Sequence, residues 1–221
     1  MPEWQRHFFY KKQSVRTTWK LRAGALVVVL LVATATRGFW ISRLATSLVC
    51  TGEVAPSDII LVENFDPNYL VFERAAELQK AGLARRALVP VQASRDPAIA
   101  NPVSKGIADV MGRQARLAAW ETIPVRETEP ISLNVAYQIR DRLVRDHVRS
   151  VLVVTVGFRS RRTSLVYHTV LRDTGTQVHC VPVFGRMTPE RWVETWHGIQ
   201  QVTEEFLKLQ YYRFYVIPFL S

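Results

Sequence analysis

An apolar stretch near the N-terminus constrains this chain more than any other feature of its sequence. Residues 23–35 read AGALVVVLLVATA, and residues 39–41 continue the stretch after Arg37. A helix needs ~20 mostly apolar residues to cross the hydrocarbon core of a bilayer. Residues 23–41 supply that length when the Arg37 side chain extends to the far interface. The sequence therefore predicts one transmembrane helix over residues 23–41.

The residues before this stretch are basic and predict its orientation. Within residues 1–22 only Glu3 opposes six cations, which are Arg6, Lys11, Lys12, Arg16, Lys20 and Arg22. Basic flanks stay in the cytoplasm, so we expect a cytoplasmic segment over residues 1–22 and expect the rest of the chain after the helix to lie outside the cytoplasm. A cleaved signal peptide is the alternative, because residues 33–35 (ATA) resemble a cleavage site. The bulky residues that follow favour a retained signal anchor.

The charge distribution argues against a nucleic-acid partner. The chain has 221 residues and a formal net charge of +10. Residues 1–43 contain eight Lys and Arg and one acid, whereas residues 44–221 contain 21 Lys and Arg and 18 acids. Most of the excess charge therefore lies beside the predicted anchor, where it sets topology and attracts anionic lipid. The rest of the chain lacks the strongly basic balance of a nucleic-acid-binding domain.

The two cysteines, Cys50 and Cys180, are far apart in the sequence. An oxidising compartment permits a disulfide between them, but sequence does not give their geometry. We expect two free, partly buried thiols, with the disulfide as the alternative. No spacing of Cys and His residues indicates a metal site.

Apolar runs and helical patterns alternate after the anchor. A linker is expected over residues 42–56 and an α/β domain over residues 57–221. Alternation of this kind predicts a Rossmann-like parallel sheet with helices on both faces. Pro90 places its strand at an edge or ends it early, and Pro189 is expected to open the last helix. The strands are predicted at 59–62, 87–91, 122–125, 151–155 and 178–183, and the helices at 69–81, 105–120, 132–148, 160–173 and from Pro189 onwards.

The last helix ends in a segment rich in aromatic residues. Residues 207–220 contain three tyrosines and two phenylalanines but few charges. Aromatic side chains of this kind are typical of a membrane interface. Packing of the segment on the core of the domain is an equally good interpretation.

The first candidate site is the turn after the strand at 151–155. It carries Arg159, Arg161 and Arg162 at the start of a helix. Ligands of open α/β sheets bind beyond the carboxyl ends of the strands, and helix N-termini favour anions there. Arginine adds bidentate donors for phosphate or carboxylate groups. The turn is therefore a candidate anion site, and a solvated basic turn paired with local acids is the alternative.

A second segment, between the strand at 122–125 and the helix at 132–148, is expected at the same rim. It carries Glu129, Ser132 and Asn134, and Ser132 is also a plausible N-cap. Glu63 lies at the end of the first strand, either facing a ligand or simply exposed. We expect Glu129, Ser132 and Asn134 to share a rim with Arg159 and Arg162. Arg162 is expected to be a surface residue whose loss weakens anion binding and barely affects stability.

These features together resemble the YdcF/SanA/ElyC envelope family over roughly residues 57–206. The acidic-x-x-Ser-x-Asn segment that starts a helix in that family matches Glu129, Ser132 and Asn134. The family's strand, Phe and Arg that follow match residues 154–155, Phe158 and Arg162. The chain departs from the family at two glycine-rich turns and at a histidine, which is Arg159 here.

The resemblance implies a single-pass protein of the bacterial inner membrane, with its α/β domain in the periplasm and a role in cell-envelope or exopolysaccharide biogenesis. The sharper hypothesis is binding or processing of a phosphorylated or anionic glycan or lipid-linked sugar, with Glu63, Arg161 and the five rim residues as ligand contacts. The alternative is a non-catalytic assembly or scaffold factor in a polysaccharide biosynthesis complex, which the replaced glycine turns favour. The sequence contains no Walker loop, GxGxxG motif or serine nucleophile elbow that would indicate a cofactor or a reaction.

Overall fold

The computed structural model describes residues 18–64 and 68–220. Two compact units divide at Trp40 and Ile41, and the second contains all of the sheet. Four of the six basic residues expected in the cytoplasm (Arg6, Lys11, Lys12 and Arg16) lie outside the described residues.

The apolar stretch forms two helices rather than one. Helix α2 (Trp19–Ala35) and helix α3 (Arg37–Thr46) meet at Thr36 with a bend of 59°. The Thr36 hydroxyl donates to the Val32 carbonyl at 2.6 Å, and hydroxyl bonds of this kind compete with the regular helix and bend it. No single helix among residues 18–64 and 68–220 is long and apolar enough to cross a bilayer, although α2 and α3 together meet the criteria of length and composition.

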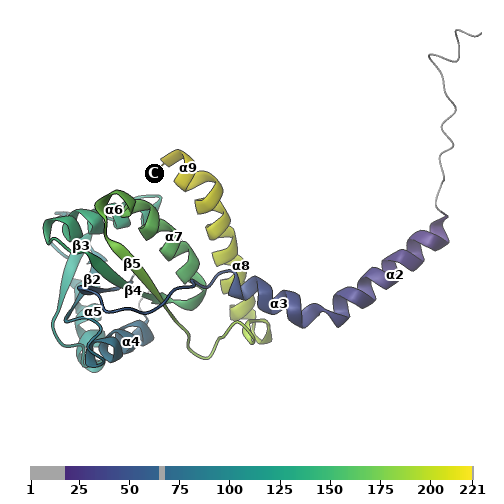
Figure 1. The fold of residues 1–221 in the computed structure, drawn as a ribbon, viewed down its shortest axis with the longest axis horizontal. Coiled ribbons are helices and arrows are strands. Elements are labelled where there is room, and N and C mark those ends of the chain that lie inside the picture. The colour runs from purple at the N-terminus through teal and green to yellow at the C-terminus, as the bar shows by residue number, and fades with distance from the viewer. Residues whose placement is uncertain (1–17, 65–67, 221) are drawn as a thin grey trace, which may run out of the picture. The chain divides into compact units, whose positions relative to one another are not determined.

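A parallel sheet of five strands forms the centre of the second unit (Figure 1). Its order is β3-β2-β1-β4-β5, and every neighbouring pair is parallel. This order is the 3-2-1-4-5 order of Rossmann-like sheets, so the predicted Rossmann-like α/β sheet is confirmed, whereas the transmembrane helix stays a prediction. The strands are β1 (Ile59–Val62), β2 (Arg86–Gln92), β3 (Trp120–Val125), β4 (Ser150–Val156) and β5 (Gln177–Val183).

Helices cover both faces of this sheet, as Figure 1 shows. Helices α4 (Tyr69–Lys80) and α5 (Pro102–Gln114) pack on the face that carries Ile60 and Val62. Helices α6 (Ile131–Arg145) and α7 (Ser160–Val170) pack on the opposite face. All four residues of β1 are buried because the strand lies at the centre of the sheet.

The chain ends in helix α8 (Trp196–Tyr211), a π-helical turn (Tyr212–Val216) and helix α9 (Ile217–Leu220). Short 3-10 helices occur at Gly157–Arg159, Arg172–Thr174 and Trp192–Glu194. The prediction that Pro189 opens the last helix is wrong. Thr195 is the N-cap instead, and its hydroxyl accepts the Gly198 N–H at 3.1 Å.

The proline in β2 does not place that strand at an edge. Strand β2 lies between β3 and β1, so the edge prediction is wrong. Its pairing with β1 stops at Leu88, before Pro90, whereas its pairing with β3 continues to Gln92. The strand tolerates Pro90 because its backbone pairing with β1 has already ended before that residue.

Residues 42–56, which the sequence suggests as a linker, contribute to the core. Ala45 and Leu48 are buried against Trp192 and Phe158. The Trp192 indole N–H donates to the Ile41 carbonyl at 3.1 Å. The compact unit therefore begins at Ile41, within α3, rather than at residue 57.

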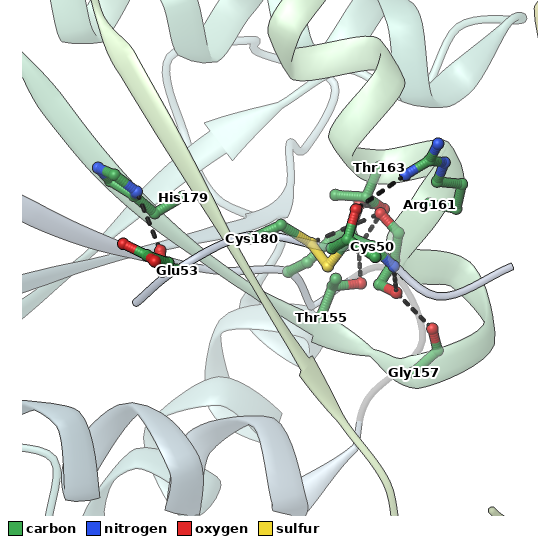
Figure 2. Close-up of a disulfide and its surroundings, with 11 residues drawn as sticks. Cys50, Glu53, Thr155, Gly157, Arg161, Thr163, His179 and Cys180 are labelled. Atoms are coloured by element: carbon green, nitrogen blue, oxygen red, sulfur yellow. Dashed lines mark hydrogen bonds between the residues drawn. A yellow bond between two sulfur atoms is a disulfide. The ribbon is translucent and has the colours of Figure 1, made fainter. Parts of the chain in front are cut away.

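The two cysteines form a disulfide, so the expectation of free thiols is wrong. Figure 2 shows Cys50 beside strand β5, from which Cys180 projects. Their Cα atoms lie 6.3 Å apart although 130 positions separate them in the sequence. The contact depends on the path of residues 48–53 along the sheet, where the Glu53 carbonyl lies 3.2 Å from the His179 ring nitrogen. No pattern in the sequence indicates that residues 48–53 follow this path.

Replacing both Cys50 and Cys180 with Ser is expected to destabilise the protein. The disulfide closes a loop of more than 100 residues, and the loss of a native disulfide typically costs about 2–5 kcal/mol. Thermal unfolding of the full chain measures the change. Reductant should lower the melting temperature of the wild type but leave the double variant unaffected. Alkylation of both native thiols without reductant would contradict the assignment.

Candidate functional site

The candidate site lies where the strand order reverses, beyond the carboxyl ends of β1 and β4. In open α/β sheets this switch point forms a crevice that takes ligands. Glu63 and Asn64 follow β1, and Gly157 to Arg162 follow β4. Glu63 and the arginine-rich turn therefore reach this rim, but their side chains have different roles.

Glu63 is buried at the end of β1, with only 3% of its surface exposed. Its carboxylate accepts hydrogen bonds from the hydroxyls of Thr155 on β4 and Thr163 on α7, the latter at 2.9 Å. Burial, with the Glu63 charge as a second cause, raises the pKa of the neighbouring Tyr167 phenol well above its usual value. Glu63 therefore holds β1, β4 and α7 together, and is neither exposed nor facing a ligand as the sequence suggested.

Arg162 forms a buried ion pair with Glu205 of α8. Its Nη2 lies 2.9 Å from Glu205 Oε2, and the two side chains are 6% and 5% exposed. The Arg162 Nε also donates to Oε2, at 3.2 Å. Two guanidinium nitrogens are thus committed to one carboxylate, which is the strong bidentate geometry that arginine favours.

The remaining Arg162 nitrogen connects this pair to α6. Its Nη1 donates to the Ser132 hydroxyl at 2.6 Å, and the guanidinium carbon lies 5.4 Å from the centre of the Tyr212 ring. The Tyr212 hydroxyl in turn accepts the Ser132 N–H at 3.2 Å. Arg162, Glu205, Ser132 and Tyr212, which we call the Arg162 cluster, therefore join α6, α7 and α8.

The expectation that Arg162 is a surface residue is wrong. Its acidic partner lies 43 positions away on a helix whose start the sequence did not indicate correctly. Ser132 is not an N-cap either, because α6 begins at Ile131 after Pro130. The Ser132 hydroxyl is used by Arg162 instead.

A pocket of about 340 Å³ opens beside the Arg162 cluster. We call it the α6–α8 pocket. It brings together four residues of the two predicted segments, so the expectation that these segments share a rim is confirmed for Glu129, Ser132, Arg159 and Arg162. The pocket is lined by Glu129, Ile131, Ser132, Arg159, Arg162, Lys208, Tyr211 and Tyr212.

The charges around the α6–α8 pocket alternate in sign. Arg159 Nε lies 3.5 Å from Glu205 Oε1, so one buried carboxylate faces two guanidinium groups. Lys208 Nζ lies 2.5 Å from Glu204 Oε1, and this bond lowers the pKa of the Glu204 carboxyl. Glu129 lies at the pocket and is exposed. The lining thus offers cationic donors, a carboxylate acceptor and two tyrosine rings.

Asn134 and Arg161 lie outside the lining of this pocket. The Asn134 amide donates to the Thr128 carbonyl at 3.0 Å and holds the loop before α6. The Arg161 side chain extends toward the Thr51 hydroxyl, 3.4 Å away, in a separate cavity (Figure 2). The structure therefore does not bring these two predicted contacts to the other four.

The N-terminus of α7 is partly covered by the chain itself. The Arg161 N–H donates to the Leu48 carbonyl at 2.9 Å, and the Cys50 N–H donates to the Ser160 hydroxyl at 2.9 Å. Figure 2 shows the hydrogen bond of the Cys50 N–H beside the disulfide. The free N–H groups that favour anions at a helix N-terminus are thus not all available, and side chains dominate the chemistry of the rim.

Sequence analysis missed the four contributors from the end of the chain, Glu205, Lys208, Tyr211 and Tyr212. A signal existed, because residues three, four and seven apart lie on one face of a helix. Glu205, Lys208 and Tyr212 have that spacing. Nothing in the sequence indicated that this face packs against the start of α6.

Comparison with known proteins assigns neither a family nor a function to the chain. No protein-family model matches the chain, and a search of curated proteins finds no match. Within residues 18–64 and 68–220, no group of three or more His, Cys, Asp and Glu side chains could hold a metal ion.

Replacing Arg162 with Ala is expected to destabilise the fold strongly. The substitution leaves the Glu205 carboxylate in a buried site without its bidentate partner, and breaking a buried pair in this way costs about 3–5 kcal/mol. Chemical unfolding of the full chain in detergent measures the change in free energy.

Arg161→Ala is the matched control, because the neighbouring Arg161 is exposed and its loss should change stability by less than ~0.5 kcal/mol. The double variant Arg162→Met/Glu205→Met should recover much of the loss, since it removes both buried charges. Equal stability of the Arg162 and Arg161 variants would show that the buried pair does not stabilise the fold.

Proposed function

We propose that this chain is a membrane-anchored protein of the bacterial cell envelope whose periplasmic α/β domain binds an anionic glycan or lipid-linked sugar. The α6–α8 pocket is the observation that carries the proposal. Its size is within the usual range for sites that take small organic ligands. It also combines a few convergent polar groups with aromatic rings, which is typical of such sites.

The lining suits a phosphorylated or acidic sugar. Arg159 and Lys208 supply charge-assisted donors for the anionic group. Tyr211 and Tyr212 supply flat, partly apolar surfaces for the sugar ring, since tyrosine presents an apolar body with a polar tip. Glu129 is an acceptor for sugar hydroxyls. The order of the segments that form this pocket is the order on which the resemblance to the YdcF/SanA/ElyC family rests.

Three features support the proposed location. The basic N-terminal flank favours a cytoplasmic N-terminus, and the bent pair α2 and α3 is a candidate span. The Cys50–Cys180 disulfide supports an oxidising compartment for the domain, because structural disulfides are rare in the cytosol.

A reporter fusion tests the topology. A reporter that is active only in the periplasm, fused after Ser221, should be active, and the same fusion with a cytoplasm-only reporter should be silent. A fusion after Trp19 serves as the control and should give the opposite result. Reversal of both pairs would place the domain in the cytoplasm and refute the proposed compartment.

Titration with inorganic pyrophosphate and with a sugar phosphate tests the pocket. Either probe should raise the melting temperature of the full chain. Arg159→Gln should lower the affinity for the probe about tenfold or more, because it removes a charge-assisted bond of roughly 1.5–3 kcal/mol. Arg161→Gln is the control, since Arg161 faces another cavity. High salt should weaken binding of both probes to the wild type.

A non-catalytic assembly or scaffold factor is the second candidate, and one observation favours it. Two residues that the sequence suggests as ligand contacts, Glu63 and Arg162, are satisfied inside the fold by threonine hydroxyls and by Glu205. A retained fold whose site residues have become structural fits a protein that binds partners instead of substrates. Absence of any thermal response of the wild type to either probe would favour this candidate.

A further inference from the structure

The C-terminal helical segment has two apolar faces, and only one of them is explained by the core. Leu209, Tyr212 and Val216 are buried, Leu209 in the cluster that contains Leu48 and Phe158 and the other two in the cluster formed with α6 and α7. Packing of the segment on the core, one of the two interpretations of the sequence, is therefore confirmed for this side. The other side remains open to solvent.

The exposed side is a continuous row of large apolar side chains, which we call the aromatic face. Its members are spaced by four, three, one and four positions, as one side of a helix requires. Tyr211 and Tyr215 stack with ring centres 5.5 Å apart, and Phe219 continues the row at 5.8 Å from Tyr215. The aromatic face consists of Leu207, Tyr211, Phe214, Tyr215 and Phe219, each at least 49% exposed.

We propose that the aromatic face is a membrane-contact surface that lies in the headgroup region of a bilayer containing anionic lipid. Tyrosine is enriched at that depth, because its ring is apolar and its hydroxyl remains hydrated. Exposure of such a row to water is otherwise unexplained, since contiguous exposed apolar patches mark interaction sites.

The charges around the aromatic face fit anionic lipid. After Glu205 the chain has no acidic residue, whereas Lys208 and Arg213 flank the row. The Arg213 guanidinium carbon lies 5.9 Å from the centre of the Phe214 ring, so cation and apolar surface are presented together. Each basic residue near an anionic membrane surface adds electrostatic attraction. A second copy of the chain would instead bring four cations together.

The chain also carries its own candidate span, which lowers the affinity that this contact needs. All the described side chains of α2 are unburied, and the helix has no acidic residue. A tethered domain meets the bilayer at high effective concentration, so a weak surface suffices. This step rests on the proposed anchor, and the contact itself needs no ligand in the α6–α8 pocket, although Lys208 and Tyr211 also line that pocket.

Depth-dependent fluorescence quenching of the full chain in vesicles tests the proposal. The Phe214→Cys variant carries an environment-sensitive dye, in vesicles of phosphatidylethanolamine and phosphatidylglycerol with nitroxide-labelled lipids. A nitroxide near the headgroup should quench the dye, and its emission should shift to the blue. Val103→Cys is the matched control, because Val103 on α5 is similarly exposed, at 71% against 67% for Phe214, on the opposite face of the sheet. Its dye should be quenched far less.

Two outcomes would overturn the proposal. One is equal quenching at positions 214 and 103. The other is energy transfer between differently labelled copies without quenching by lipid, which would assign the face to a second copy of the chain. Replacing phosphatidylglycerol with a neutral lipid should weaken the quenching at position 214, and an unchanged signal would contradict the role of Lys208 and Arg213.

A further variant separates this proposal from the ligand site. Phe214→Ser/Phe219→Ser alters the aromatic face without changing the lining of the α6–α8 pocket. With a dye at Thr203→Cys on the same helix, it should lose lipid quenching but keep the thermal response to pyrophosphate. Quenching that persists in the double-serine variant refutes the membrane contact. A wild type that shows no thermal response to pyrophosphate refutes the ligand site but leaves the membrane contact standing.

Discussion

The buried pair between Arg162 and Glu205 determines how the last third of this domain is arranged. A charge of either sign would be costly at this depth without its partner, so α7 and α8 are held in the one register that joins them. The third guanidinium nitrogen extends the constraint to Ser132 at the start of α6. The wall of the α6–α8 pocket and the orientation of the C-terminal helix both follow from this set of contacts.

The disulfide and the residues around it impose a second constraint, at the other side of α7. Residues 48–53 run along strand β5 and satisfy the Arg161 N–H at the start of the helix. The chain that follows α3 is thereby attached to the sheet by a covalent bond as well as by hydrogen bonds. An extended segment in this position also occupies part of the helix terminus, where an external anion would otherwise bind.

The central elements were predictable from the sequence because their signals are local. The run of β-branched and apolar residues at 151–155 has no reasonable alternative to a buried strand, and Gly82 ends α4 with a positive φ of 73°. The site was only half predictable. The strand-end rule brought Glu129 and Arg159 to one rim, but the burial of Arg162 and the pairing of Cys50 depend on partners 43 and 130 positions away. No local pattern carries that information.

Tyr211 belongs both to the lining of the α6–α8 pocket and to the aromatic face. If the aromatic face lies at the headgroups of a bilayer, the pocket opens at the same level. A ligand with a sugar or phosphate in the pocket and an apolar chain in the membrane would then use both surfaces at once, whereas a free glycan would use only the pocket. Taken together, the two proposals favour a lipid-linked sugar over a soluble one, because both surfaces include Tyr211. This preference depends on the geometry of one helix and not on a catalytic group.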